Sequence, residues 1–234
     1  MENKKNIYLG IMSGTSRDGV DVALTRIQRD TIETIDAFTL DYPNELRSLL
    51  EKLCQPEESC LLKEIAQAEC TLGNFFSLAA LKIIEKHKNL RSEIKAIGSH
   101  GHTLYHLPSK PYPFSLQVGG AAIINARTGI KTISDFRNAD IAKGGEGAPL
   151  VPAFHDWALS KPETERVIVN IGGISNITVL KLDKKIYGFD TGPGNCLLDE
   201  WYEKNQAGKF DRDGTFAASG RANAEILSAL LDDT

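Results

Sequence analysis

Residues 10–21 read GIMSGTSRDGVD and join two β-like runs through a turn of glycines, hydroxyl residues and carboxylates. Glycine lets backbone N–H groups come close to a ligand, and consecutive amides in a tight turn form an anion-binding concavity. The carboxylates of Asp18 and Asp21 are suited to holding a hydrated cation beside that anion. An ordinary β-hairpin turn is the alternative, since Asp-Gly is a common signal for one. The predicted phosphate contacts are Gly14, Thr15, Ser16, Arg17, Asp18, Gly19, Val20 and Asp21.

The pattern of strand, glycine turn and strand occurs a second time, from residue 166. The β-like runs of the first copy cover 7–13, 19–28 and 31–40, and those of the second cover 166–170, 177–182 and 186–189. Residue identity between the copies is low, so the repeat rests on the pattern alone. The second turn, GGISN at 172–176, is expected to face the first across a shared cleft and to bind phosphate through Gly172, Gly173 and Asn176.

Helical periodicity fills the segments between the β-like runs. The predicted helices cover 44–54, 58–88 with a break near Gly73, 119–128, 149–159 and 222–231.

A carboxylate, Asp190, follows the last β-like run and precedes a glycine turn and a helix start. A carboxylate at that place can act as a general base if a nucleophilic hydroxyl or water lies within hydrogen-bond reach. The alternative is a helix cap or a turn carboxylate. Asn195 is the better capping candidate, which leaves Asp190 available for catalysis.

Two further segments carry polar side chains suited to ligand contact. His100 and His102 lie two apart on an extended segment and are expected to point the same way. A pair of metal ligands is the alternative, but no third ligand has suitable spacing, so a sugar or phosphate contact is favoured. Arg137, in the segment Asp135-Phe136-Arg137, has the fork geometry for a bidentate contact with a carboxylate or phosphate. A structural Asp–Arg pair is the alternative.

The bulk composition excludes several classes of protein. At 234 residues the chain has room for one large domain or two small ones. A net charge of −4 with interspersed basic residues argues against binding nucleic acid or an anionic membrane. The N-terminus lacks the apolar core of a signal peptide, and no run approaches the roughly 20 apolar residues that span a bilayer. Four cysteines without a CxxC pair fit a reducing cytoplasm, which is the expected location.

Taken together, these segments resemble the anhydro-N-acetylmuramic acid kinases. The matching segments are Gly10–Leu24, Gly98–His106, Gln117–Gly129, Ser134–His155, Asn170–Thr178 and Gly188–Asp199. The resemblance implies an α/β protein with an actin-like ATPase fold, in which two ribonuclease-H-like domains close around a nucleotide cleft. The expected first domain covers 1–160, and 161–234 begins a second domain that is expected to be incomplete, because family members extend well beyond residue 234.

The resemblance also implies a reaction and roles for particular residues. Asp190 would activate a water that opens the anhydro bridge of 1,6-anhydro-N-acetylmuramic acid, and the freed O6 would take the γ-phosphate of ATP. The two glycine turns would bind ATP, and Asp18 would hold Mg²⁺ through water. The sugar would be held by His102, Asp135 and Arg137.

Three points stay open at the level of sequence. The family usually has Gln where this chain has Glu146, so the contacts of that loop are expected to differ in charge. The sequence does not give the oligomeric state, for which a homodimer is one option. A kinase for another amino sugar and a truncated, non-catalytic fragment are the alternative functions.

Overall fold

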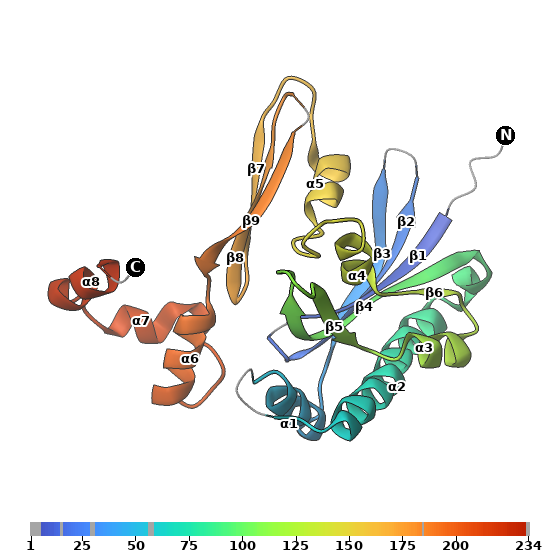
Figure 1. Ribbon diagram of the computed structural model, residues 1–234, viewed down its shortest axis with the longest axis horizontal. Coiled ribbons are helices and arrows are strands. Elements are labelled where there is room, and N and C mark those ends of the chain that lie inside the picture. The colour runs from blue at the N-terminus through green and yellow to red at the C-terminus, as the bar shows by residue number, and fades with distance from the viewer. Residues whose placement is uncertain (1–5, 15, 29–30, 56–58, 184, 233–234) are drawn as a thin grey trace. The chain divides into compact units, whose positions relative to one another are not determined.

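The computed structural model describes residues 6–14, 16–28, 31–55, 59–183 and 185–232. The chain divides into two compact units, which are described separately (Figure 1). One unit contains Met1–Arg166 and Val179–Tyr187, and the other contains Val167–Thr178 and Gly188–Thr234.

The first unit is built on a mixed sheet with the strand order β3-β2-β1-β4-β5 and with β6 paired to β4. Its strands are β1 Asn6–Ser13, β2 Gly19–Ile27, β3 Ile32–Asp41, β4 Ile94–Leu107, β5 Phe114–Val118 and β6 Thr132–Ile133. Strand β1 runs antiparallel to β2 and parallel to β4. The α/β class and the hairpin between the second and third predicted strands are confirmed, whereas residues 29–30 of its turn lie outside the described residues.

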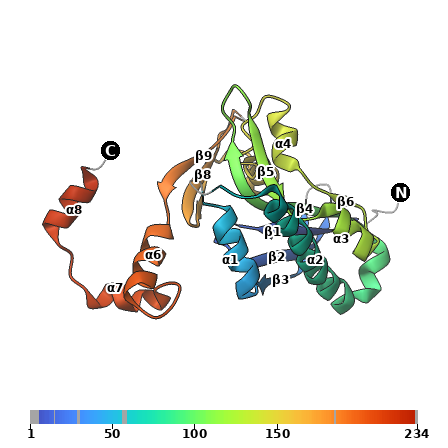
Figure 2. The same ribbon diagram turned by 60° about the horizontal axis from the view of Figure 1, so that its bottom comes forward.

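Helices α1 (Asn44–Leu53) and α2 (Leu62–Lys86) cover one face of this sheet (Figure 2). Alternate residues of β1 and β2 point into the core between sheet and helices, as the period of two in a strand requires. The fully buried side chains include Ile7, Leu9, Val20, Leu24, Leu50, Leu72, Phe76 and Ile83. The rest of the first unit's helices are a 3-10 helix at Lys88–Glu93, α3 Ala121–Thr128, α4 Phe136–Ile141 and α5 Pro152–Leu159.

The predicted break at Gly73 is wrong, because α2 is one continuous helix of 25 residues. Gly73 lies where α2 meets the start of α3. A Cβ atom at Gly73 would be 2.9 Å from the Cα of Gly120 and 3.0 Å from Cδ1 of Ile123. The glycine therefore permits a close approach of two segments rather than ending the helix.

The second half of the chain forms a three-stranded sheet, three short α-helices and one 3-10 helix. The strand order is β7-β8-β9, with β7 Arg166–Ile171, β8 Ile174–Leu180 and β9 Ile186–Pro193. They are followed by α6 Cys196–Asn205, a 3-10 helix at Arg212–Gly214, α7 Thr215–Ser219 and α8 Ala224–Leu231. The connection from β7 to β8 is only Gly172 and Gly173, shorter than the five-residue turn predicted from the sequence.

Large apolar side chains in the second unit are exposed. On β7, Val167, Val169 and Ile171 are 57%, 60% and 69% exposed. The four apolar side chains Ile226, Leu227, Leu230 and Leu231 of α8 are all more than half exposed.

Candidate functional site

The predicted phosphate turn connects β1 to β2 in the first unit. Thr15 lies outside the described residues. The N–H of Arg17 donates to the carbonyl of Gly14 at 3.3 Å, and the Arg17 backbone has a positive φ of 54°. The Ser16 hydroxyl donates to Oδ1 of Asp18 at 2.7 Å. The chain therefore makes a tight turn here, which a non-glycine residue closes in the left-handed region.

The second half of the turn is fixed by β3. A Cβ atom at Gly19 would be 2.5 Å from the carbonyl oxygen of Leu40, so only glycine fits there. The Val20 side chain is fully buried in the core, so any contact it makes with a phosphate comes from its backbone. Asp18 and Asp21 are exposed, and Asp21 accepts a hydrogen bond from the Thr39 hydroxyl at 2.5 Å.

A chain of buried polar side chains lies directly behind the turn. The Tyr42 hydroxyl donates to Oγ of Ser13 at 2.6 Å, and that Oγ is 2.8 Å from Nδ1 of His102. His102 Nε2 is 3.5 Å from Sγ of Cys54, whose thiol donates to the carbonyl of Thr103. This pattern places the imidazole proton on Nε2 and leaves Nδ1 to accept from Ser13.

The surroundings of these hydrogen-bonded side chains keep them uncharged. Burial, together with the positive charges of Arg17 and His100, lowers the pKa of His102 to about 4. Burial raises the pKa of Tyr42 and of Cys54, although Arg17 acts in the opposite direction on Cys54. A neutral imidazole is what the hydrogen-bond pattern requires.

His102 and His100 do not point the same way, so that prediction is wrong. Ser99 of β4 pairs with Ile11, and His102 pairs with Ser13, so β4 has one more residue than β1 between these pairs. Gly101 takes a φ of +79° in this bulge. A bulge with one extra residue reverses the alternation of faces. His102 therefore lies in the core, 1% exposed and with both ring nitrogens engaged, and is not open to a sugar.

His100 lies on the other face of the sheet and contacts Arg137. Nε of Arg137 donates to Nε2 of His100 at 3.0 Å, and its Nη1 donates to the carbonyl of Gly147 at 2.9 Å. Burial lowers the pKa of His100, and the Arg137 charge lowers it further. Arg137 thus ties the bulge of β4 to the glycine-rich loop at 144–147. Arg137 belongs to the short helix α4, which follows β6.

Asp135 and Asp140 stand at the two ends of α4. Asp135 has a positive φ of 63°, is exposed, and accepts a hydrogen bond from Nδ2 of Asn138 at 2.7 Å. Asp140 accepts from the N–H of Gly147 at 2.8 Å. A Cβ atom at Gly145 would be 2.1 Å from Oδ2 of Asp140, so the loop can approach this carboxylate only as glycine.

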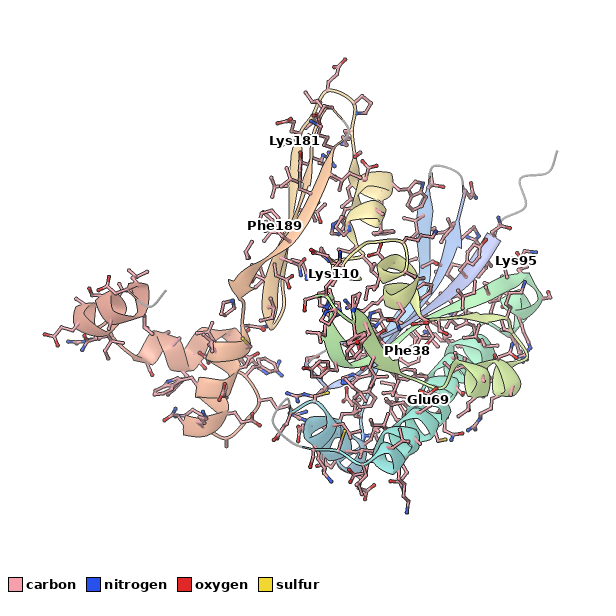
Figure 3. The ribbon with its side chains drawn as sticks, in the orientation of Figure 1. Phe38, Glu69, Lys95, Lys110, Lys181 and Phe189 are labelled. Atoms are coloured by element: carbon pink, nitrogen blue, oxygen red, sulfur yellow. The ribbon has the colours of Figure 1, made fainter. Side chains whose placement is uncertain are left out.

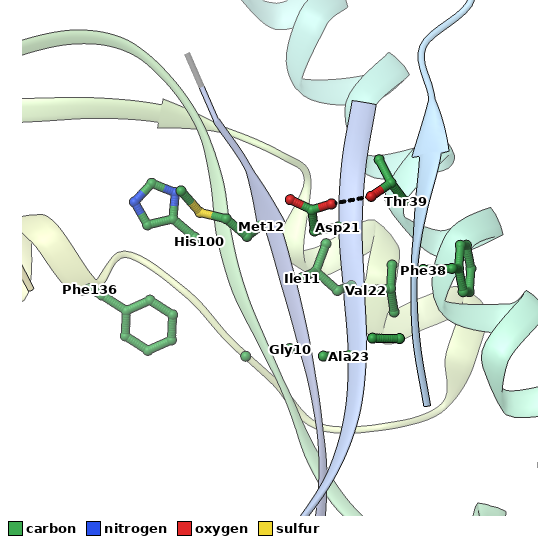
Figure 4. Close-up of a pocket in the computed structure, with 12 residues that line it drawn as sticks. Gly10, Ile11, Met12, Asp21, Val22, Ala23, Phe38, Thr39, His100 and Phe136 are labelled. Atoms are coloured by element: carbon green, nitrogen blue, oxygen red, sulfur yellow. Dashed lines mark hydrogen bonds between the residues drawn. The ribbon is translucent and has the colours of Figure 1, made fainter. Parts of the chain in front are cut away.

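Two cavities adjoin His100. The larger, about 600 Å³, has small residues of four strands as its floor and His100, Asp21 and Phe136 beside it (Figure 4). The floor residues are Gly10, Ala23, Ala37 and Gly98, which pair with one another in register.

The smaller cavity, about 270 Å³, has a polar lining that includes Asp135, Asn138, Gln117 and Ser134. Oε1 of Gln117 is buried and has no hydrogen-bond partner among the described residues. At the start of α3, Glu69 of α2 (labelled in Figure 3) accepts a hydrogen bond from the N–H of Gly119 at 2.6 Å. The sequence interpretation missed Gln117 and Asn138, because single amides carry no spacing signal.

In the second unit, the turn Gly172-Gly173 lies against the segment that follows β9. The N–H groups of Gly194 and Asn195 donate to the carbonyls of Gly173 and Gly172 at 2.8 and 2.9 Å. A Cβ atom at Gly194 would be 2.1 Å from the Gly172 oxygen, so glycine is required there. Asn176, half-buried, lies on β8.

Asp190 lies within β9 rather than after it, because the strand continues to Pro193. Its side chain is exposed, and the described part of the chain gives its carboxylate no hydrogen bond or ion pair. Asn195 does occupy the N-cap position of α6, but its side chain makes no capping hydrogen bond. Asn195 is thus at the predicted cap position, and Asp190 is not the cap.

Within the described residues, no helix is both long and apolar enough to cross a bilayer. The same residues contain no group of three or more His, Cys, Asp or Glu side chains placed to hold a metal ion. All four cysteines are free.

Solved structures with a similar arrangement share little sequence with this chain. A Ppx/GppA family member from Aquifex aeolicus aligns with a TM-score of 0.43 at 13% identity, covering 84% of this chain and 54% of that one. The ethanolamine utilization protein EutJ from Carboxydothermus hydrogenoformans aligns with a TM-score of 0.31 at 14% identity, covering 85% and 56%. Scores this low carry no argument for a family.

The sequence comparisons are far closer. The anhydro-N-acetylmuramic acid kinase of Vibrio cholerae is 44% identical over 231 residues, which are 98% of this chain and 62% of that protein. The corresponding kinase of Pasteurella multocida is 41% identical over 233 residues, covering 100% of this chain and 62% of the relative. The chain thus spans about three fifths of the length of these curated relatives. Since the sequence profile of anhydro-N-acetylmuramic acid kinases also matches residues 6–234, the chain belongs to that family.

Proposed function

We propose that the protein is an ATP-dependent kinase that opens the anhydro bridge of 1,6-anhydro-N-acetylmuramic acid and phosphorylates O6. The products are N-acetylmuramic acid 6-phosphate and ADP, and the reaction serves the recycling of cell-wall peptidoglycan in the cytoplasm. The observation that carries this proposal is the family match along residues 6–234. The exposed carboxylate of Asp190 supports it from the structure.

Asp190 is the proposed general base. It takes a proton from a water whose oxygen bonds to the anomeric carbon, and the bond from that carbon to O6 breaks. The freed O6 then bonds to the γ-phosphorus of ATP, and the bond to the β-phosphate oxygen breaks to release ADP. One anhydro-sugar, one water and one ATP are consumed for each sugar phosphate and ADP that are formed. Such phosphoryl transfer depends mainly on positioning and on charge neutralisation.

The proposed ATP contacts are the two glycine turns, at 14–21 and at Gly172, Gly173 and Asn176. Tight turns with glycines can present N–H groups to phosphate. The first turn is tight, with the N–H of Arg17 on the carbonyl of Gly14, which supports this role. Asp18 is exposed beside it, and only its Oδ1 accepts from Ser16. A hard, hydrated cation such as Mg²⁺ prefers oxygen ligands, so Asp18 fits a contact through water.

The proposed sugar contacts lie at the polar cavity beside α4. Asp135 and His100 line that cavity, and Arg137 holds His100 in place through a hydrogen bond. Arg137 is the proposed partner of the lactyl carboxylate, because a guanidinium matches a carboxylate bidentately. His102 was expected in this group, but its burial assigns it to the support of the phosphate turn instead.

The test is a product assay in water enriched in ¹⁸O, with the protein from its complete reading frame, MgATP and the anhydro-sugar. We expect N-acetylmuramic acid 6-phosphate with one ¹⁸O on the anomeric carbon, measured by mass spectrometry. The Asp190→Asn variant should lose turnover by a factor of about 10³ or more while binding ATP as before. Asp183→Asn, at an exposed carboxylate of the turn after β8, is the matched control and should be fully active.

Three outcomes would contradict the proposal. Phosphorylation of free N-acetylglucosamine but not of the anhydro-sugar would indicate a kinase for another amino sugar. No product from a folded protein would indicate a non-catalytic role. Full turnover by Asp190→Asn would remove Asp190 as the base.

A further inference from the structure

The strongest feature outside the proposed contacts is the buried polar chain behind the phosphate turn. Its members come from three elements: Ser13 ends β1, His102 lies in the bulge of β4, and Tyr42 and Cys54 flank α1. Ser13, Tyr42 and His102 are 2%, 7% and 1% exposed. Buried polar groups are costly unless paired, so a chain of four with consistent hydrogen bonds fixes the surrounding backbone.

Tyr42 contacts both ends of the turn. Its backbone N–H donates to the carbonyl of Asp18 at 2.9 Å, and its hydroxyl donates to Oγ of Ser13 at 2.6 Å. Ser13 immediately precedes the turn, and Asp18 closes it. One residue therefore holds the entry and the exit of the five-residue connection, 14–18, between β1 and β2.

The hydrogen bonds that begin at the Tyr42 hydroxyl all run in one direction. Because Ser13 accepts from Tyr42, its own hydrogen is available to Nδ1 of His102. The Nε2–H of His102 in turn meets the sulfur of Cys54, and the thiol hydrogen meets the Thr103 carbonyl. After Tyr42, which donates only, each member accepts from one neighbour and donates to the next, so the Ser13 hydroxyl has one favoured orientation.

We propose that Tyr42 is a positioning residue, which acts through Ser13 and His102 to hold the phosphate turn in its ligand-binding shape. The proposal rests on the proposed function, because that function makes the turn an ATP site. Removing the Tyr42 hydroxyl frees one end of the turn, so the binding-competent shape becomes less populated. Apparent affinity falls in proportion to that population.

The experiment compares MgATP binding by calorimetry in wild type, Tyr42→Phe and Ser77→Ala. Tyr42→Phe keeps the ring, which packs against Phe75 with 5.2 Å between centroids. Ser77→Ala removes a buried hydrogen bond of the same length, 2.6 Å to the Gly73 carbonyl, far along the sequence from the turn. We expect Tyr42→Phe to weaken MgATP binding ~3- to 10-fold, the worth of one buried hydrogen bond. Ser77→Ala should lower the melting temperature similarly and leave the affinity unchanged.

A second measurement keeps the result separate from that of the proposed function. Hydrogen exchange of the ligand-free protein reports on the turn directly, and the amide of Arg17 should exchange faster in Tyr42→Phe than in Ser77→Ala. If wild type does not bind MgATP, the proposed function fails, and this exchange comparison still decides the positioning role. Equal exchange and equal affinity in Tyr42→Phe and wild type would overturn the proposal. If Tyr42→Phe does not fold, Ser13→Ala takes its place in both measurements.

Discussion

His102 shows how one inserted residue changes the role of a side chain. Sequence spacing placed it beside His100 and facing a ligand. The extra residue in the bulge of β4 turns it into the core, where Ser13 and Cys54 occupy its ring nitrogens. A buried imidazole that must stay neutral links folding to protonation.

The pKa of His102 predicts a particular dependence of stability on pH. The folded pKa is about 4 and the ordinary value is 6.5, so the unfolded chain binds more protons between these values. This group's stabilisation is complete above pH 6.5 and is lost as the pH falls toward 4, by about 3 kcal/mol in total. The free energy of unfolding, measured with urea at several pH values from 7.5 to 4, should fall less with decreasing pH in His102→Asn than in wild type. An NMR titration midpoint for His102 near 6.5 would contradict this account.

Among the elements, α2 and its contact with α3 depend on a glycine in the middle of a long helix. Glycine in a helix interior costs up to about 1 kcal/mol relative to alanine, so its presence needs a reason. The backbone of Gly120 supplies one, since no Cβ fits between it and Gly73.

We therefore expect Gly73→Ala to destabilise the protein in spite of the better helix propensity of alanine. Overpacking of a tight contact costs about 1–3 kcal/mol, which exceeds the gain in propensity. The free energy of unfolding in urea measures the difference. Cys70→Ala, at an exposed position of the same helix, is the control and should change stability little. A more stable Gly73→Ala protein would show that α2 and α3 can separate without cost.

The sequence predicted elements well where their signal is local. Strands β1, β2 and β3 and the helices α1 and α3 follow from periodicity and from end signals such as Gly129, which caps α3 with a φ of 70°. The features that it could not predict depend on contacts distant in sequence. The positive φ of Gly101 accompanies a bulge set by pairing with β1, and Gln117 becomes part of a cavity only when β5 lies beside β4. The position of Asn195 at the N-cap of α6 is confirmed, although its side chain makes no hydrogen bond to the first turn of that helix.

At the scale of the whole molecule, the two units differ in how much apolar surface they bury. The first unit has a continuous core between its sheet and α1 and α2. In the second unit, α6 and α8 contain no buried residue. Local stability follows buried apolar contacts, so the two units should open with different free energies.

Native-state hydrogen exchange of the 234-residue chain should show this difference. Amides of β1 and the middle of α2 should exchange only through global unfolding, and those of β7 and α8 should exchange much faster. Equal amide exchange rates in the two units would contradict this expectation. They would show that the apolar side chains of the second unit are buried by contacts within that unit. The thermal unfolding of a Trp157→Phe variant, followed by Trp201 fluorescence and compared with circular dichroism, gives an independent reading of the second unit.

The floor of the larger cavity, Gly10, Ala23, Ala37 and Gly98, has a consequence for the entropy of whatever it contacts. Glycine and alanine have no side-chain rotamers to lose, whereas most surface residues give up about 0.5–2 kcal/mol of rotamer freedom when covered. These four positions span four hydrogen-bonded strands, so their backbone is also already ordered. A contact made on this floor therefore carries almost no ordering cost from the floor residues, and that cost falls mainly on the partner.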